Sequence, residues 1–236
     1  MRFRILALAI ALLFVLPLGG RCMELDLTTP APPRAVPQLS SGALLDAPPM
    51  KLDCAAAMLL EAESGQILFE FNADSQRAVA SVTKLMTILL TLEAVDSGRL
   101  ALEQQVVISK EAAGMGGSQV LLDVGETQSV SLLLKSMIVG SANDAAVALA
   151  EALYGSEALC CAKMNERAQE LGMADTHFVN CTGLPVDGQH TTARDVARMS
   201  IAVFGHSLYS AYSQIWLDEL DHGDGLMTHL TNTKYM

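Results

Sequence analysis

Basic side chains are scarce in this chain of 236 residues: 15 Lys and Arg stand against 26 Asp and Glu, a formal net charge of −11. Binding to nucleic acid needs a basic face that neutralises phosphates, so we expect no nucleic-acid partner. Charged residues are also few, at 17%, whereas hydrophobic residues reach 51%. That balance excludes bulk disorder and supplies enough apolar side chains for a substantial core.

Histidines and cysteines at the spacing of metal ligands are missing as well. The five histidines form no ligand pair, and the five cysteines fit no zinc motif. We therefore expect no metal site. An odd cysteine count in a chain long enough to fold without disulfides favours buried free thiols. One apolar helical stripe is expected to hold Cys160, Met164, Ala168 and Leu171.

Long apolar runs are confined to the N-terminus. Arg2 and Arg4 precede the apolar residues 5–18, and Gly19 and Gly20 follow them. A basic start, a short apolar middle and small residues predict a secretory signal peptide over residues 1–20. The run is shorter than the ~20 residues of a membrane-spanning helix, and the alternatives are an uncleaved anchor or lipidation at Cys22. We expect an exported protein that works outside the cytoplasm.

Prolines are concentrated just after this segment: six of the eight lie within residues 23–50. Proline lacks an amide donor and disfavours both helix and sheet, so we interpret residues 21–50 as an extended linker. A single folded domain is expected over residues 51–236. It begins with a predicted β-hairpin, in which residues 55–61 and 66–71 flank Glu63-Ser64-Gly65.

Helical periodicity dominates the remainder. The apolar pattern predicts a short strand over residues 105–109 and helices over residues 81–96, 129–140, 143–153, 156–171 and from Thr192 onwards. The predicted fold class is α/β (α+β), with a sheet hairpin followed by a large helical lobe.

A first chemical motif is Ser81-Val82-Thr83-Lys84 at the start of a predicted helix. Residues i and i+3 share a helix face, so the Ser81 hydroxyl and the Lys84 amine can reach one cleft. A lysine whose pKa is lowered from about 10.4 can act as the base that activates a serine nucleophile. Alone the motif is weak, because chance supplies such pairs.

A second motif is Ser141-Ala142-Asn143, between two predicted helices. One interpretation is structural: Ser141 or Asn143 caps the following helix, since both residue types favour that position. The other is functional, with Ser141 as a proton relay and Asn143 as a group that binds a peptide backbone.

Several segments together resemble one family. Residues 80–87 and 141–146 resemble the active-site helix and the second motif of the D-alanyl-D-alanine carboxypeptidases, the low-molecular-mass penicillin-binding proteins. Similar segments follow in the family's order: Met164-Asn165-Glu166-Arg167-Ala168, Gly172-Met173, residues 176–180, Gly183-Leu184-Pro185 and residues 191–195.

The resemblance implies a β-lactamase/transpeptidase-like fold and specific residue roles. Ser81 would attack the bond between the two terminal D-alanines of a peptidoglycan stem peptide, forming an acyl-enzyme. Lys84 would accept its proton, Ser141 would pass a proton to the departing D-alanine, and Asn143 would bind the substrate backbone. β-Lactams would acylate Ser81 as inhibitors, and no cofactor is implied.

The family's third motif, a Lys-Thr-Gly strand, is not found: none of the chain's six lysines precedes Thr-Gly. In the family this strand lines the cleft opposite the second motif. We therefore expect a chain truncated at its C-terminus, lacking the later sheet strands and the C-terminal membrane-binding helix of many relatives. Peripheral membrane association is not supported by this chain.

Two alternatives remain open. The first is a catalytically incomplete fragment that binds wall peptides. The second is a β-lactamase, which the sequence favours less. Class A β-lactamases carry Ser-Asp-Asn and a deacylating Glu-x-x-Leu-Asn, whereas this chain has Ser141-Ala142-Asn143 and no Leu-Asn pair.

Overall fold

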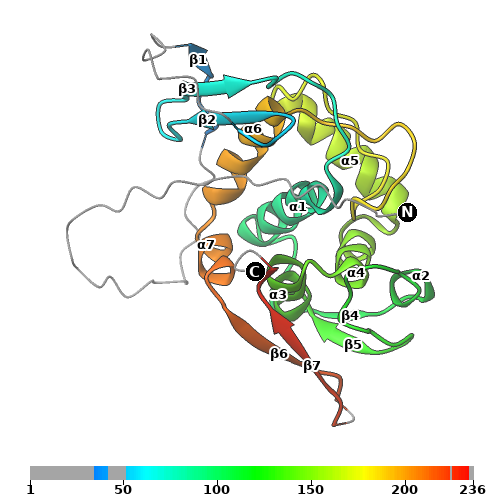
Figure 1. Ribbon diagram of the computed structural model, residues 1–236. Helices are drawn as coiled ribbons and strands as arrows, with labels where there is room; N and C mark the ends of the chain where they lie inside the picture. Colours follow the sequence, from blue (N-terminus) through cyan, green and yellow to red (C-terminus); the bar gives the residue numbers. More distant parts are fainter. Residues whose placement is uncertain (1–34, 42–51, 224, 234–236) are drawn as a thin grey trace, which may run out of the picture.

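The computed structural model describes residues 35–41, 52–223 and 225–233. A small sheet lies at one end of the molecule, a cluster of helices forms its body, and a two-stranded hairpin projects at the other end (Figure 1). The predicted signal peptide and most of the predicted linker lie outside the described residues. The elements run in this order: β1 (Ser40–Ser41), β2 (Ala57–Leu60), β3 (Gln66–Phe71), η1 (Ala80–Thr83), α1 (Lys84–Asp96), β4 (Gln105–Val107), α2 (Lys110–Ala113), β5 (Thr127–Ser129), α3 (Val130–Gly140), α4 (Asn143–Tyr154), α5 (Glu157–Glu170), α6 (Ala193–Phe204), α7 (Ser207–Ser213), β6 (Leu217–Asp221) and β7 (Met227–Thr231).

The predicted hairpin is present as β2 and β3, which pair antiparallel with an irregularity between Leu59 and Leu60. Its turn is held by the Glu61 side chain, which accepts a hydrogen bond from the Ser64 amide at 2.7 Å. Helix α6 packs against β2 and covers the sheet on that side. The hairpin therefore forms from local turn chemistry and is anchored by a helix distant in sequence.

One part of the predicted linker joins this sheet. Ser40–Ser41 form β1, which pairs parallel with β3, so the sheet order is β1-β3-β2. The chain passes so close to the hairpin turn that a β-carbon at Gly65 would lie 2.6 Å from the Gln38 carbonyl oxygen. The expectation that the folded part begins only near Lys51 thus misses this short strand, because backbone pairing to β3 needs no particular side chains.

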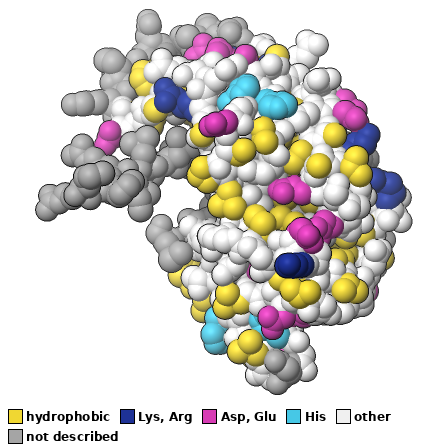
Figure 2. Space-filling view, turned by 90° about the vertical axis from the view of Figure 1, so that its right-hand side faces the viewer, with side chains coloured by type: hydrophobic (Ala, Val, Ile, Leu, Met, Phe, Trp, Pro, Cys, Tyr) yellow, Lys and Arg dark blue, Asp and Glu magenta, His cyan; other side chains and the backbone are white. Residues whose placement is uncertain are grey.

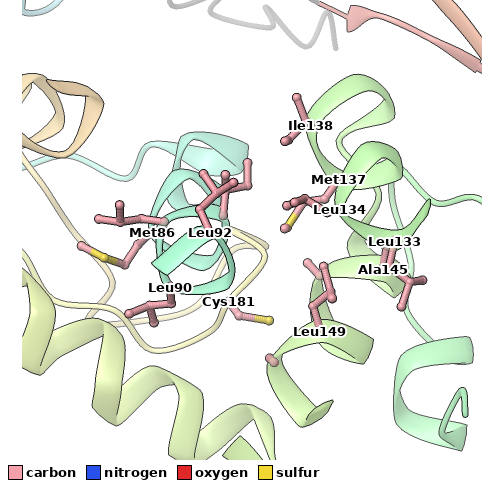
Figure 3. Packing of buried hydrophobic residues seen from close by; sticks show 14 of the residues in the cluster. Met86, Leu90, Leu92, Leu133, Leu134, Met137, Ile138, Ala145, Leu149 and Cys181 are labelled. Atoms are coloured by element: carbon pink, nitrogen blue, oxygen red, sulfur yellow. The ribbon is translucent and has the colours of Figure 1, made fainter. Parts of the chain in front are cut away.

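Helix α1 runs through the centre of the helical body (Figure 1), and nine of its 13 residues are buried. A helix that is apolar on all sides belongs inside a protein rather than on its surface. It contacts helices α3, α4, α5 and α6. Figure 3 shows side chains of α1, α3 and α4 converging on one core, with Cys181 among them. The sequence predicted one helix over residues 81–96; its first residues instead form the 3₁₀ turn η1.

The other predicted helices are confirmed, and polar side chains mark where three of them begin. Ser129, Ser156 and Thr192 each accept a hydrogen bond from an amide three residues later, which satisfies an otherwise unpaired N–H of the first turn. The predicted short strand is β4, which pairs with β5. The expected apolar stripe of α5 is also present, since Cys160, Met164, Ala168 and Leu171 are all buried.

The β6–β7 hairpin was not predicted. Its inward residues Leu220 and Leu230 are fully buried or nearly so, at 0% and 2% exposure, and β6 and β7 both contact α3. An ion pair of 2.7 Å between Lys135 of α3 and Asp218 of β6 supports the same contact. The hairpin is therefore a packed part of the body.

The outer surface is mixed. Figure 2 shows acidic and apolar side chains interspersed over one face, with fewer basic ones, as the net charge of −11 leads one to expect. Among the described residues, no single helix is long and apolar enough to cross a membrane; α4 and α5 meet that test only as a pair, across an 82° bend.

Candidate active site

Ser81 and Lys84 lie side by side at the junction of η1 and α1. In a 3₁₀ turn the side chains of residues i and i+3 are nearly eclipsed, so the two groups are aligned. The Lys84 Nζ and the Ser81 Oγ are 3.1 Å apart. Ser81 is exposed to solvent, whereas Lys84 is only 2% exposed. The arrangement presents a hydroxyl at the surface with an amine directly behind it.

Burial changes the acid–base chemistry of that amine. Removing Lys84 from water disfavours the charged ammonium, and this desolvation lowers the pKa of Lys84 to about 8. The Nζ also donates a hydrogen bond of 2.7 Å to the Thr182 carbonyl oxygen. A substantial fraction of Lys84 is therefore neutral near pH 8, with a lone pair available to take a proton from a neighbouring hydroxyl.

The loop that supplies this carbonyl is pressed against η1. Gly183 has φ +85°, and a β-carbon at that position would lie 1.9 Å from the Ala80 carbonyl oxygen. Ala80 itself has φ +46°. A left-handed backbone conformation combined with so close an approach admits only glycine. The Thr182–Gly183 pair is the only Thr-Gly in the sequence, but its role was missed because it depends on a contact between segments about 100 residues apart in the chain.

The Ser141-Ala142-Asn143 segment does not cap helix α4. Its N-cap is Ala142, with no side-chain capping bond. Ser141 has φ +57° and ends α3 in the left-handed conformation. Its half-buried hydroxyl has no hydrogen-bond partner among the described residues. The structural interpretation of this motif is therefore wrong, and the Ser141 hydroxyl is available for another partner.

Asn143 is buried, at 3% exposure, with one end of its carboxamide fixed. Its Nδ2 donates to the Gly116 carbonyl oxygen at 2.6 Å, and its backbone amide donates to the Ser118 carbonyl oxygen at 2.7 Å. Its Oδ1 is buried and has no partner among the described residues. A buried acceptor without a donor is costly, so this oxygen is a candidate for contact with a ligand.

A chain of contacts connects the two motifs. Gly183 touches the backbone of Ala80 and Ser81, and the next residue is Leu184. A β-carbon at Gly117 would lie 3.5 Å from Leu184 Cδ2 and 2.9 Å from Asn143 Nδ2. Helix α1, which follows Ser81, also contacts both α3 and α4, which flank Ser141. Residues 183–184 therefore link the first motif, by way of Gly117, to Asn143 of the second.

No metal centre is found in the ranges that the structure describes: no group of three or more His, Cys, Asp or Glu is arranged to hold an ion there. Four of the five cysteines fall in those ranges, and all four are free thiols. Cys160, Cys161 and Cys181 are buried, as expected, while Cys54 is partly exposed.

Comparison with known proteins gives a consistent result. The D-alanyl-D-alanine carboxypeptidase family model matches residues 44–235. D-alanyl-D-alanine carboxypeptidase DacF of Bacillus subtilis is 38% identical over 178 residues, which cover 75% of this chain and 46% of that protein. DacD of Salmonella typhimurium is 34% identical over 220 residues, covering 83% of this chain and 56% of that protein. The chain spans about half the length of the curated relatives it matches.

Solved structures confirm the predicted fold class. Penicillin binding protein 6B from Escherichia coli is 31% identical, with a TM-score of 0.74, over 83% of this chain and 62% of that one. The D-alanyl-D-alanine carboxypeptidase DacD from Francisella tularensis is 34% identical, with a TM-score of 0.67, over 72% of this chain and 42% of that one. The fold is that of the penicillin-binding proteins, and the chain belongs to the D-alanyl-D-alanine carboxypeptidase family.

Proposed function

We propose that this protein is a serine-type D-alanyl-D-alanine carboxypeptidase that removes the terminal D-alanine of peptidoglycan stem peptides. The observation that carries the proposal is the 3.1 Å contact between the exposed Ser81 hydroxyl and the buried Lys84 amine, whose pKa is about 8. A nucleophile beside a base that is partly neutral near physiological pH is the arrangement that acyl transfer requires.

In the proposed reaction, the Ser81 Oγ attacks the carbonyl carbon of the bond between the two D-alanines while its proton passes to the Lys84 Nζ. The tetrahedral intermediate collapses by breaking the C–N bond. The departing D-alanine receives a proton through the Ser141 hydroxyl, and an ester remains on Ser81. Water then hydrolyses this acyl-enzyme, which releases the shortened peptide and restores the Ser81 hydroxyl.

Asn143 is proposed to bind the substrate backbone. Its unpartnered Oδ1 could accept a hydrogen bond from a substrate amide, while its Nδ2 stays fixed to the Gly116 carbonyl. A hydrogen bond from a substrate amide would remove the energetic cost of this buried, unsatisfied oxygen. Because the Asn143 side chain is already fixed in place, binding would cost little conformational entropy.

The substrate implies a location. Peptidoglycan stem peptides lie outside the cytoplasmic membrane, so the proposed activity requires export, in agreement with the signal peptide predicted over residues 1–20. We also propose that residues 51–236 act as the catalytic domain, with β-lactams as acylating inhibitors.

Labelling with a fluorescent penicillin tests the proposal on the chain as it exists. We expect one covalent adduct, detected on a gel and mapped to Ser81 by peptide mass spectrometry. Ser81→Ala should abolish it. The matched control is Ser97→Ala, which changes an exposed serine at the other end of α1 and should label normally.

Two outcomes would contradict the proposal. Folded wild-type protein that takes up no label would favour the fragment that only binds wall peptides. A label that persists in Ser81→Ala would exclude Ser81 as the nucleophile.

A further inference from the structure

The peptide unit between Thr182 and Gly183 is held at both ends. Its carbonyl oxygen accepts a hydrogen bond of 2.7 Å from Lys84 Nζ. Its amide, on Gly183, donates one of 2.7 Å to Asn180 Oδ1. The C=O and N–H of a planar trans peptide point in opposite directions. Lys84 and Asn180 therefore form hydrogen bonds to the same rigid peptide group from opposite sides.

Asn180 is itself held in place. Its Nδ2 donates to the Leu184 carbonyl at 2.9 Å, and its Oδ1 also accepts from Gln189 Nε2 at 3.2 Å. The Gln189 Oε1 in turn accepts from the amides of Val179 and Asn180, each at 2.9 Å. Both ends of the Asn180 carboxamide are thus used inside one short loop, which leaves the side chain a single orientation.

We propose that Asn180 is a positioning residue for the acylation step: it orients the Thr182–Gly183 peptide so that the Thr182 carbonyl holds the Lys84 amine toward Ser81. This inference rests on the proposed function, since it gives Lys84 its role as base. Asn180 touches neither Ser81 nor the reacting atoms and acts through the peptide.

The chemical reason lies in the geometry of an amine. Neutral Lys84 has two N–H bonds and one lone pair. With one N–H directed at the Thr182 carbonyl, 2.7 Å away, rotation of the amine is restricted and the lone pair can face the Ser81 hydroxyl at 3.1 Å. Once the proton is transferred, the same carbonyl stabilises the new ammonium. Donation from the Gly183 amide to Asn180 polarises the peptide and strengthens that carbonyl as an acceptor.

Two other titratable groups border this peptide. Cys181 lies within the loop, and the Glu157 side chain of α5 accepts a hydrogen bond from the Cys181 amide at 3.0 Å. Both stay unchanged in the variants below, so differences among the variants report on position 180.

The experiment measures the rate of acylation by penicillin as a function of pH in two variants. Asn180→Leu has a similar shape but makes none of the carboxamide's hydrogen bonds, so the Gly183 amide loses its acceptor; we expect the plateau rate to fall about tenfold. Asn180→Asp keeps the acceptor for the Gly183 amide, loses the donor to the Leu184 carbonyl, and adds a negative charge that favours the Lys84 ammonium. We expect its plateau rate to exceed that of Asn180→Leu and its pH midpoint to rise by about one unit.

Asn165→Ala is the matched control. The Asn165 side chain makes a comparable set of hydrogen bonds, to the backbone of Cys161 and Phe178, but none to the Thr182–Gly183 peptide. We expect it to lower the melting temperature while the rate and midpoint of acylation stay at wild-type values. Circular dichroism establishes folding first, and Asn180→Asp carries the test if Asn180→Leu does not fold.

The inference is overturned if folded Asn180→Leu acylates like the wild type, or if Asn180→Asp is no faster than Asn180→Leu. Wild-type protein that is not acylated at all counts against the proposed function instead. In that case the Lys84 titration, followed by the ¹³Cε chemical shift, still decides the matter: its midpoint should rise in Asn180→Asp and stay unchanged in Asn165→Ala. An unchanged midpoint in Asn180→Asp overturns the inference.

Discussion

At the scale of single residues, the proposed mechanism makes Lys84 the group that determines when Ser81 can react. Its side chain is 2% exposed and its pKa is lowered to about 8 by desolvation. Only the neutral amine can accept the Ser81 proton, and the neutral form predominates above the pKa. The proposed chemistry is therefore switched on by rising pH.

We expect the rate of acylation by penicillin to rise with pH, through a midpoint near 8, to a plateau. Stopped-flow labelling between pH 6 and pH 10 measures it. Lys84→Arg should show no such rise, because a guanidinium stays protonated at every pH in that range. A wild-type rate that is flat across these pH values would contradict Lys84 as the base.

Gly183 offers a second test at this scale. Gly183→Ala would place a β-carbon 1.9 Å from the Ala80 carbonyl oxygen, so the loop and η1 must separate. We expect acylation to fall at least a hundredfold, since Thr182 would no longer reach Lys84. Gly98→Ala is the control: its φ of +71° imposes similar backbone strain, but nothing lies within 4 Å of the new β-carbon. It should cost about 1–2 kcal/mol of stability and leave acylation intact.

At the scale of helices and strands, local sequence predicts where helices begin but not what their flanking residues do. Ser129, Ser156 and Thr192 behave as N-caps. Ser141 and Asn143 have the residue types of caps, yet neither caps α4: the Ser141 hydroxyl has no partner among the described residues, and the Asn143 side chain donates to the Gly116 carbonyl of a distant loop. Competition of this kind between segments cannot be read from one segment alone.

This difference predicts opposite effects for two serine variants: Ser156→Ala should affect stability and not acylation, and Ser141→Ala should affect acylation and not stability. Ser156→Ala should lower the free energy of unfolding by about 1 kcal/mol and leave acylation unchanged, because it removes a cap. Ser141→Ala should change stability by less than about 0.5 kcal/mol, since no hydrogen bond is lost among the described residues, yet it should slow acylation. Urea unfolding and penicillin labelling measure the two effects. Equal loss of stability in both variants would show that Ser141 is structural.

The β6–β7 hairpin supports the end of α3. Leu230 lies under Gly140, where a β-carbon would be 3.4 Å from Leu230 Cδ2, and Gly140 directly precedes Ser141. We expect Leu230→Ala and Leu220→Ala each to cost roughly 2–4 kcal/mol, as large-to-small changes in a core do. Only Leu230→Ala should also slow acylation at a temperature where both variants are folded. The same slowing in Leu220→Ala would remove the specific role of Leu230.

At the scale of the whole molecule, the sequence predicts the local features well. The β2–β3 hairpin, the helical lobe and the alignment of Ser81 with Lys84 follow from turn residues, apolar period and spacing. The contacts among distant segments could not be predicted: Thr182 on Lys84, and β1 on β3. The first depends on Gly183, and the need for a glycine there is evident only once η1 is seen to pack against it. The second is a backbone contact that leaves little trace in the side chains.

The buried thiols can report how often the chain around them opens. Burial raises the pKa of Cys160 to about 12 and that of Cys161 to about 11, and it raises the pKa of Cys181 as well. Such thiols resist alkylation until the surrounding chain opens, whereas the partly exposed Cys54 should be modified quickly. Cys181 lies between Asn180 and Thr182. The rate at which iodoacetamide modifies it, followed by mass spectrometry, would therefore measure how often that loop opens. A bound β-lactam should slow this pace; alkylation of Cys181 as rapid as that of Cys54 would mean that the loop is open in the resting protein.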